Sequence, residues 1–125
     1  NIHFELGRSI IGQCGFLVSK VLYNKKSFGR NYLIVDAGMN DLMRPALYNS
    51  YHKILNISTK NQDFDKYDVV GPVCESSDVF ATNYNLPISL RNDIIVICST
   101  GAYGESMSSN YNLRNSIKSY FSNSI

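Results

Sequence analysis

Short apolar runs separated by polar turns dominate this chain. Residues 13–23 (QCGFLVSKVLY) mix alternating apolar and polar positions with β-branched side chains, which is typical of a strand. The polar, glycine-containing segment 24–31 then predicts a hairpin turn into a second strand over residues 31–38. Further strands are predicted over residues 53–58, 68–73 and 93–100. The last of these, DIIVICST, has the strongest strand pattern.

The segments between the strands predict loops and one short helical turn. Asn40 or Asp41 is a suitable cap for a helical turn whose length Pro45 limits. The tail, residues 112–121, fits a helix and a strand equally well. Loops are predicted over residues 61–67, 74–81 and 83–93. Short strands at close spacing, with only brief helical pieces, predict a mainly β fold, an all-β sandwich or barrel, in one domain.

Composition narrows the class of protein. The 125 residues suit one domain, and 44% hydrophobic with 18% charged residues is globular rather than disordered. A net charge of +2, with an isolated basic pair at Lys25 and Lys26, gives no indication of nucleic-acid or anionic-membrane binding. The apolar runs are shorter than the roughly 20 residues that a membrane helix needs. The chain starts with Asn1 inside apparent structure, so we expect a fragment of a longer protein.

Three cysteines at wide spacing make a disulfide framework or a structural metal site an unfavourable interpretation. Cys14 and Cys98 lie in strand-like runs and are expected to be buried packing residues. Cys74 precedes Glu75 in the turn GPVCESSD, where a thiol can be a proton donor, a nucleophile or filler. A nucleophile needs a histidine partner, and neither His3 nor His52 has a telling neighbourhood.

Three other turns carry groups that could bind an anion or a flat ligand. FELGRSIIG offers Glu5, Gly7 and Arg8, and such a glycine and arginine suit a phosphate or carboxylate, although an ordinary polar turn has the same composition. Arg44 and Tyr48 in RPALY face one side of a helical turn, which suits a carboxylate or, alternatively, a solvated arginine over a packed tyrosine. In GAYGES, a tyrosine between two glycines either contacts a ligand or covers the edge of the core.

These motifs occur together, as ELGRSI, VDAGMNDLMRPALY, YDVVGPVCESSD and GAYGESMSSNYN, and span nearly the whole chain. In this combination the chain resembles the C-terminal part of the diaminopimelate decarboxylase family. These pyridoxal-phosphate enzymes make L-lysine from meso-diaminopimelate and combine an α/β barrel with a C-terminal β-barrel domain. The resemblance implies that residues 1–8 end the α/β-barrel domain, as its last strand and cofactor loop. Residues 9–125 are then the β-barrel domain, truncated at its end.

The resemblance also implies contacts with the cofactor, pyridoxal 5′-phosphate. Glu5 would lie by the pyridine nitrogen, and Gly7 would offer its backbone to the phosphate. Arg8 would lie over the phosphate and the substrate carboxylate. Leu6 replaces the family's proline, so this loop is expected to be looser. Tyr103 would reach both cofactor and substrate.

The remaining implied roles concern the substrate. Arg44 and Tyr48 would grip the distal carboxylate of diaminopimelate. Cys74 would be the proton donor, and Glu75 would meet the distal amino group. In the family the active site lies between two subunits, so the resemblance implies a homodimer in which the Cys74–Glu75 loop reaches the partner's site. The three free thiols fit a reducing compartment, and we expect the protein in the cytoplasm.

No lysine of the chain lies in a context that resembles the family's cofactor lysine, so we expect the chain alone to be inactive. Three alternatives stay open. One is a decarboxylase of the same fold that acts on ornithine, arginine or carboxynorspermidine. The others are a non-catalytic β-barrel module and a Cys–His hydrolase that uses Cys74 and His52.

Overall fold

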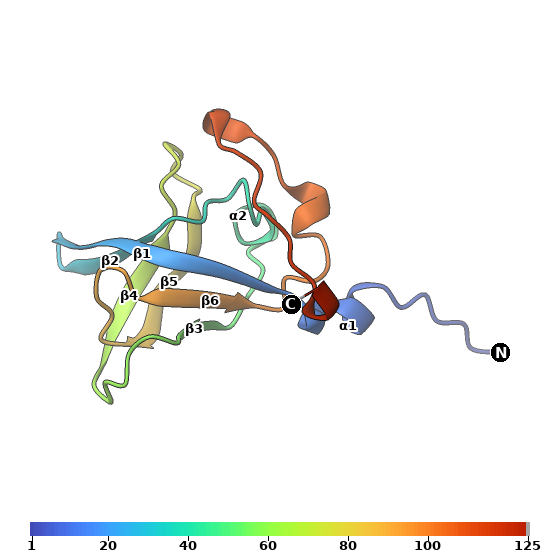
Figure 1. The fold of residues 1–125 in the computed structure, drawn as a ribbon, viewed down its shortest axis with the longest axis horizontal. Coiled ribbons are helices and arrows are strands. Elements are labelled where there is room, and N and C mark those ends of the chain that lie inside the picture. The colour runs from blue at the N-terminus through green and yellow to red at the C-terminus, as the bar shows by residue number, and fades with distance from the viewer. Residues whose placement is uncertain (125) are drawn as a thin grey trace.

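The computed structural model describes residues 1–124, and six strands form most of its ordered structure (Figure 1). The strands are β1 (Phe16–Ser27), β2 (Arg30–Val35), β3 (Ile54–Asn56), β4 (Phe64–Val70), β5 (Val79–Pro87) and β6 (Ile94–Cys98). They form one sheet in the order β3-β6-β1-β2-β4-β5, in which β2 and β4 are parallel and the other pairs antiparallel. The two end strands lie close together: the Ile54 amide of β3 donates a hydrogen bond to the Tyr84 hydroxyl of β5 at 2.9 Å. The sheet is therefore a nearly closed barrel, and the prediction of a mainly β fold is confirmed.

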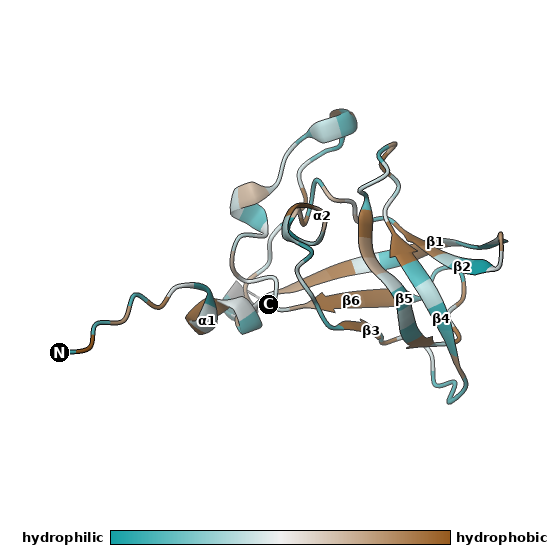
Figure 2. Ribbon diagram, turned by 180° about the vertical axis from the view of Figure 1, so that it is seen from behind, coloured by the Kyte–Doolittle hydropathy of each residue, from teal (hydrophilic) through white to brown (hydrophobic). Residues whose placement is uncertain are grey.

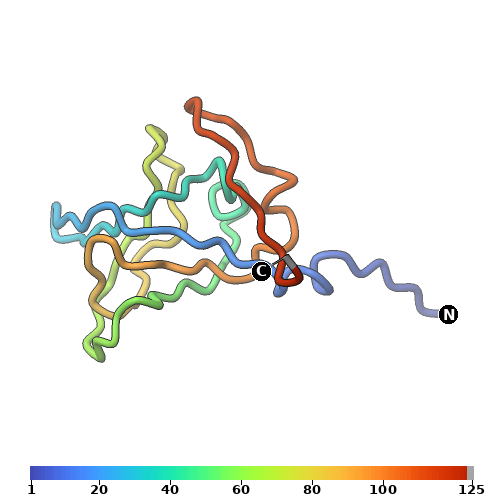
Figure 3. Tube along the Cα trace, in the orientation of Figure 1, coloured from blue at the N-terminus to red at the C-terminus, as the bar shows by residue number. Residues whose placement is uncertain are grey.

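The helical pieces are short and lie at one end of the barrel. They are α1 (Arg8–Ile11), α2 (Arg44–Tyr48) and the 3₁₀ turns Gly12–Cys14, Glu105–Met107, Tyr111–Leu113 and Ser122–Ser124. Residues 1–6 have no regular secondary structure and extend away from the barrel as an arm (Figures 1 and 3). The tail, ambiguous from sequence, contains only single 3₁₀ turns over the described residues. Across residues 1–124 no helix has the length and apolar character to span a membrane.

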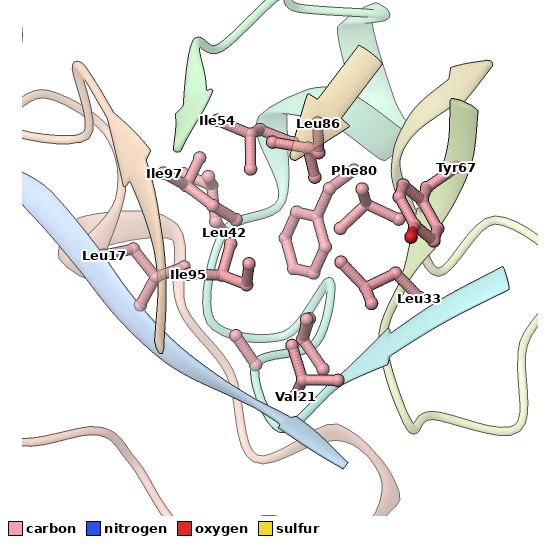
Figure 4. Close-up of a cluster of buried hydrophobic side chains, with 13 residues drawn as sticks. Leu17, Val21, Leu33, Leu42, Ile54, Tyr67, Phe80, Leu86, Ile95 and Ile97 are labelled. Atoms are coloured by element: carbon pink, nitrogen blue, oxygen red, sulfur yellow. The ribbon is translucent and has the colours of Figure 1, made fainter. Parts of the chain in front are cut away.

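Side chains from all six strands fill the interior of the barrel. Along β1, Leu17, Ser19 and Val21 are buried while Phe16 and Val18 are exposed, which is the two-residue period of a half-buried strand. Figure 2 marks apolar segments in several of the strands. Figure 4 shows the resulting core, which is formed by Leu17, Val21, Leu33, Val35, Ala37, Leu42, Ile54, Tyr67, Val69, Phe80, Leu86, Ile95 and Ile97. Each large aliphatic or aromatic side chain buried there contributes roughly 1.5–3 kcal/mol.

The predicted hairpin is present between β1 and β2. Its turn is Phe28–Gly29, and both residues have positive φ, +48° and +73°. Two consecutive left-handed residues are the conformation that a tight turn between twisted antiparallel strands requires. Glycine meets this requirement without strain at the second position.

Two other predictions of secondary structure are wrong. β4 begins at Phe64, inside a predicted loop, and β5 occupies a stretch predicted to be loop or irregular. These two strands pair with each other, from Phe64↔Pro87 to Val70↔Val79. Most of their polar side chains lie on the outer face, and an irregularity at Asp68 interrupts the alternation. The backbone ladder therefore stabilises strands whose sequence lacks a clear apolar period.

The local predictions around α2 and Cys14 also need correction. α2 has Met43 at its N-cap and Pro45 in its first turn, where proline fits a helix, so neither Asn40 nor Asp41 caps it. The Asp41 carboxylate instead accepts the Gly38 amide at 2.8 Å. Cys14 is exposed in a 3₁₀ turn rather than buried in a strand.

Candidate functional site

An open cleft of about 490 Å³ lies where the N-terminal arm and α1 meet the segments that follow α2 and β6. The arm and α1 form one wall, and Arg44, Tyr51 and His52 contribute to the other. The predicted site residues that line the cleft are Glu5, Leu6, Gly7, Arg8 and Arg44. The structure therefore brings together two motifs that are 36 residues apart in the sequence, from Arg8 to Arg44.

Two tyrosine rings hold the Arg44 side chain beside this cleft. Its guanidinium carbon lies 5.1 Å from the centroid of the Tyr48 ring and 5.4 Å from that of the Tyr103 ring. Both distances are within the range of cation–π contacts. Tyr48 is one helical turn after Arg44 in α2, whereas Tyr103 comes from the turn after β6. Three predicted substrate residues therefore form one cluster.

The backbone of Tyr103 is strained into this position. Its φ is +59°, in the left-handed region that costs a residue with a side chain roughly 1–2 kcal/mol. Its hydroxyl oxygen lies near Gly7, since a Cβ atom placed on that glycine would be 3.9 Å from it. Strain of this kind is concentrated at functional positions.

His52, which the sequence suggested only as the partner of Cys74 in a hydrolase, lines the cleft. Its side chain is buried, and Nδ1 lies 2.9 Å from the Cys98 carbonyl oxygen. A carbonyl oxygen only accepts, so Nδ1 is the donor of this hydrogen bond. The other ring nitrogen, Nε2, is buried and has no hydrogen-bond partner within the described residues. The sequence could not predict this buried arrangement, because the Cys98 carbonyl that holds the ring is 46 residues away.

Cys74 and Glu75 lie elsewhere, on the loop between β4 and β5 (residues 71–78, hereafter the Cys74 loop). This loop, yellow-green at the upper left of Figure 1, projects from the barrel, and both residues are exposed. Neither residue lines the cleft. Over residues 1–124 no hydrogen bond joins the Cys74 thiol to a histidine, so the chain by itself does not assemble the Cys–His pair of a hydrolase.

Asp78 closes the Cys74 loop from inside. Its side chain is buried, and its two oxygens accept the Met39 and Val73 amides, each at 2.7 Å. Burial raises the pKa of this carboxyl above its ordinary value of 3.8, although the two amides act in the opposite direction. The sequence marked Asp78 only as part of a polar turn.

The cleft carries the charges that anions require but no amine. Arg8 and Arg44 supply two guanidinium groups, and Glu5 supplies one carboxylate. None of the lysines lines the cleft. Within residues 1–124 no three histidine, cysteine or acidic side chains gather as a metal site, and the three cysteines are free thiols.

Residues 10–101 match the C-terminal sheet domain of the pyridoxal-dependent decarboxylases. The chain belongs to this family. It is 53% identical to the diaminopimelate decarboxylase of Bacteroides thetaiotaomicron. The match covers 99% of this chain and 32% of that protein. The prediction of the fold as the C-terminal β-barrel domain is confirmed, as is pyridoxal phosphate as the cofactor of the family.

Solved structures of relatives in the pyridoxal-dependent decarboxylase family have the same barrel. Diaminopimelate decarboxylase from Helicobacter pylori, complexed with L-lysine, is 50% identical with a TM-score of 0.80, covering 86% of this chain and 26% of that one. The enzyme from M. jannaschii, also in complex with L-lysine, is 40% identical with a TM-score of 0.85, covering 88% and 25%. The chain therefore spans about a third or less of the length of the relatives it matches.

Proposed function

We propose that this chain acts as the C-terminal domain of a two-domain decarboxylase that converts meso-2,6-diaminopimelate to L-lysine and CO₂, the last step of lysine biosynthesis. In this proposal residues 1–8 belong to the end of the α/β-barrel domain, and residues 9–125 to the β-barrel domain. The observation that carries the proposal is the Arg44 guanidinium, held between Tyr48 and Tyr103 beside the cleft that Glu5 and Arg8 line. High identity to diaminopimelate decarboxylases supports it.

The arm and cleft fit the anionic parts of pyridoxal phosphate. Gly7 has no side chain to block an approach to its backbone, and Arg8 supplies a fork of N–H donors for a phosphate. Glu5 would hold the protonated ring nitrogen, while Leu6 completes this wall and the Tyr103 hydroxyl lies beside Gly7. The bound cofactor would accept the electron pair that remains when CO₂ leaves the substrate.

Arg44 is suited to select a substrate with a second carboxylate. Its stacked guanidinium is planar and rigidly placed, so that two parallel N–H groups can bind a carboxylate. The Tyr48 hydroxyl, one helical turn further along α2, would add a further donor. Ornithine and arginine lack a distal carboxylate and would leave the arginine without a partner. This difference favours diaminopimelate over the substrates of other decarboxylases of this fold.

Cys74 and Glu75 would serve the site of a second subunit. Both are exposed on a loop outside the cleft of their own chain, which supports a homodimer with shared active sites. Cys74 would give the proton of its thiol to the carbon that has lost CO₂, and the thiolate would regain a proton from water. Glu75 would bind the distal ammonium group of the substrate. We place this dimer in the cytoplasm.

The experiment compares three substrates with the holoenzyme, which here means this chain together with the α/β-barrel domain of the proposed enzyme. We expect CO₂ and L-lysine from meso-diaminopimelate, and little turnover of ornithine or arginine. A preference for ornithine would overturn the choice of substrate. The isolated chain with added pyridoxal phosphate is the control, and we expect it to be inactive because no lysine lines its cleft. Turnover by the isolated chain would contradict the two-domain proposal.

A further inference from the structure

We infer that Asp78 is a positioning residue for the Cys74 loop, and that it fixes this loop to the turn that leads into α2. The inference rests on the proposed function, because it concerns how the proposed proton donor Cys74 and its neighbour Glu75 are held. Asp78 itself is buried and does not line the cleft. It would therefore act through the backbone of the loop.

The first argument is the hydrogen bonding within the loop. The Asp78 carboxylate accepts the amide of Val73, the residue directly before Cys74, at 2.7 Å. Three backbone bonds complete the loop, from Gly71 N to the Asp78 carbonyl at 3.0 Å, from Glu75 N to the Val73 carbonyl at 2.8 Å and from Asp78 N to the Glu75 carbonyl at 3.1 Å. Both the start and the end of the Cys74–Glu75 segment are therefore bound to one residue.

The second argument is the bond out of the loop. The other carboxylate oxygen of Asp78 accepts the Met39 amide at 2.7 Å, across 39 residues of sequence. Met39 lies in the turn between β2 and α2, and α2 carries Arg44 and Tyr48. The buried Asp78 carboxylate thus connects two parts of the chain. One is the Cys74 loop, which is proposed to reach the partner's site, and the other is the turn before α2, which carries the proposed substrate residues Arg44 and Tyr48.

The third argument is the fit of Gly71 against the carboxylate. A Cβ atom placed on Gly71 would lie 2.3 Å and 2.4 Å from the two Asp78 oxygens. Any larger residue at position 71 would push the carboxylate away from its amides. Gly71 therefore provides a second, independent way to displace the same group.

The test measures holoenzyme kinetics for Asp78→Asn and Gly71→Ala. In Asp78→Asn one oxygen becomes an NH₂ group that faces a backbone N–H, so one of the two bonds is lost. We expect kcat to fall about 10- to 100-fold in each variant, because small displacements of catalytic groups have effects of this size. We also expect the solvent deuterium isotope effect on kcat to rise, because proton delivery from Cys74 becomes slower. We expect the kcat of the double variant to lie within about twofold of the kcat of the slower single variant, because both changes displace the same carboxylate.

Asp68→Asn is the matched control. Asp68 is also a buried carboxylate that accepts a backbone amide, that of Asn83 at 2.8 Å, and its second oxygen lies 3.0 Å from Arg30 Nε, so its two partners lie outside the Cys74 loop. We expect this variant to lose thermal stability while it keeps the parental kcat and isotope effect. The inference is overturned if Asp78→Asn and Gly71→Ala behave as Asp68→Asn does. If one of the two variants does not fold, the other variant decides alone. If the parent holoenzyme does not decarboxylate meso-diaminopimelate, the proposed function is refuted instead.

Discussion

The backbones of Gly15 and Gly101 cross in direct contact, so that a Cβ atom on Gly15 would lie 2.3 Å from the Gly101 amide nitrogen. Hydrogen bonds flank the crossing, from Thr100 N to the Gly15 carbonyl and from Gly101 N to the Gly12 carbonyl, each at 3.0 Å. The crossing joins the segment before β1 to the turn that carries Tyr103. The location of the Tyr103 ring therefore depends on two residues that have no side chain.

The first prediction concerns Gly101→Ala. The new methyl group would lie 2.2 Å from the Ile11 carbonyl oxygen, a backbone atom that cannot rotate away. We expect the free energy of unfolding to fall by about 1–3 kcal/mol, and the KM for diaminopimelate to rise because Tyr103 moves. Thermal unfolding and steady-state kinetics of the holoenzyme measure both. Gly29→Asn is the control, because a Cβ atom placed on Gly29 meets no atom within 4 Å apart from its chain neighbours, and asparagine tolerates positive φ. Unchanged stability of Gly101→Ala would show that the turn can shift freely.

The second prediction concerns Arg44→Lys. Lysine keeps the charge but loses the planar group that stacks on Tyr48 and Tyr103 and binds a carboxylate with two bonds. We expect the KM for meso-diaminopimelate to rise about tenfold or more, which corresponds to about 1.4 kcal/mol of lost binding. Arg91→Lys is matched to it, since the Arg91 guanidinium carbon lies 4.9 Å from the Tyr23 ring centroid without lining the cleft. Equal KM values for the two variants would argue against a carboxylate at Arg44.

The sequence predicted the fold class because several strands have a clear apolar pattern. β6 has five consecutive apolar residues, and the inward positions of β1 include Leu17 and Val21. It predicted only the end of β4, residues 68–70, and missed β5, because pairing with neighbouring strands stabilises these two strands. Strands of this kind are recognised only when the partner is known.

In the candidate site too, the sequence predicted local neighbours but not long-range contacts. Arg44 and Tyr48 were identified because helical spacing makes them neighbours, and the cluster with Tyr103 agrees with that prediction. The buried hydrogen bonds of His52 and Asp78 were not predicted, because they span 46 and 39 residues. Their residue types alone do not distinguish a buried, bonded side chain from an exposed one.

The third prediction concerns pH. Burial raises the pKa of Asp78 in the folded protein, so just above pH 3.8 the folded state binds more protons than the unfolded state. The contribution of Asp78 to stability is therefore greatest below the unfolded pKa and declines as pH rises through the folded pKa. As pH rises from the unfolded to the folded pKa of Asp78, we therefore expect the parent to lose stability relative to Asp78→Asn. Thermal unfolding of the two holoenzymes at several pH values measures this difference. Arg114 lowers and Asp41 raises the pKa of Asp78, so the same measurement on Asp41→Asn tests the contribution of Asp41. A difference that is constant with pH, or grows in favour of the parent, would contradict the direction of the shift.

The last prediction concerns the exchange of Cys74 between subunits. If each site combines Arg44 of one subunit with Cys74 of the other, then Cys74→Ala and Arg44→Ala holoenzymes are each inactive, but a hybrid dimer has one intact site. After dissociation and random reassociation of equal amounts, half of the dimers are hybrids with one of two sites intact, so we expect about a quarter of the parental activity. Decarboxylation of meso-diaminopimelate before and after mixing measures this recovery. A site built within one subunit would place a substitution in every site of the hybrid and give no recovery. The exposed position of Cys74 outside the cleft of its own chain favours the first result.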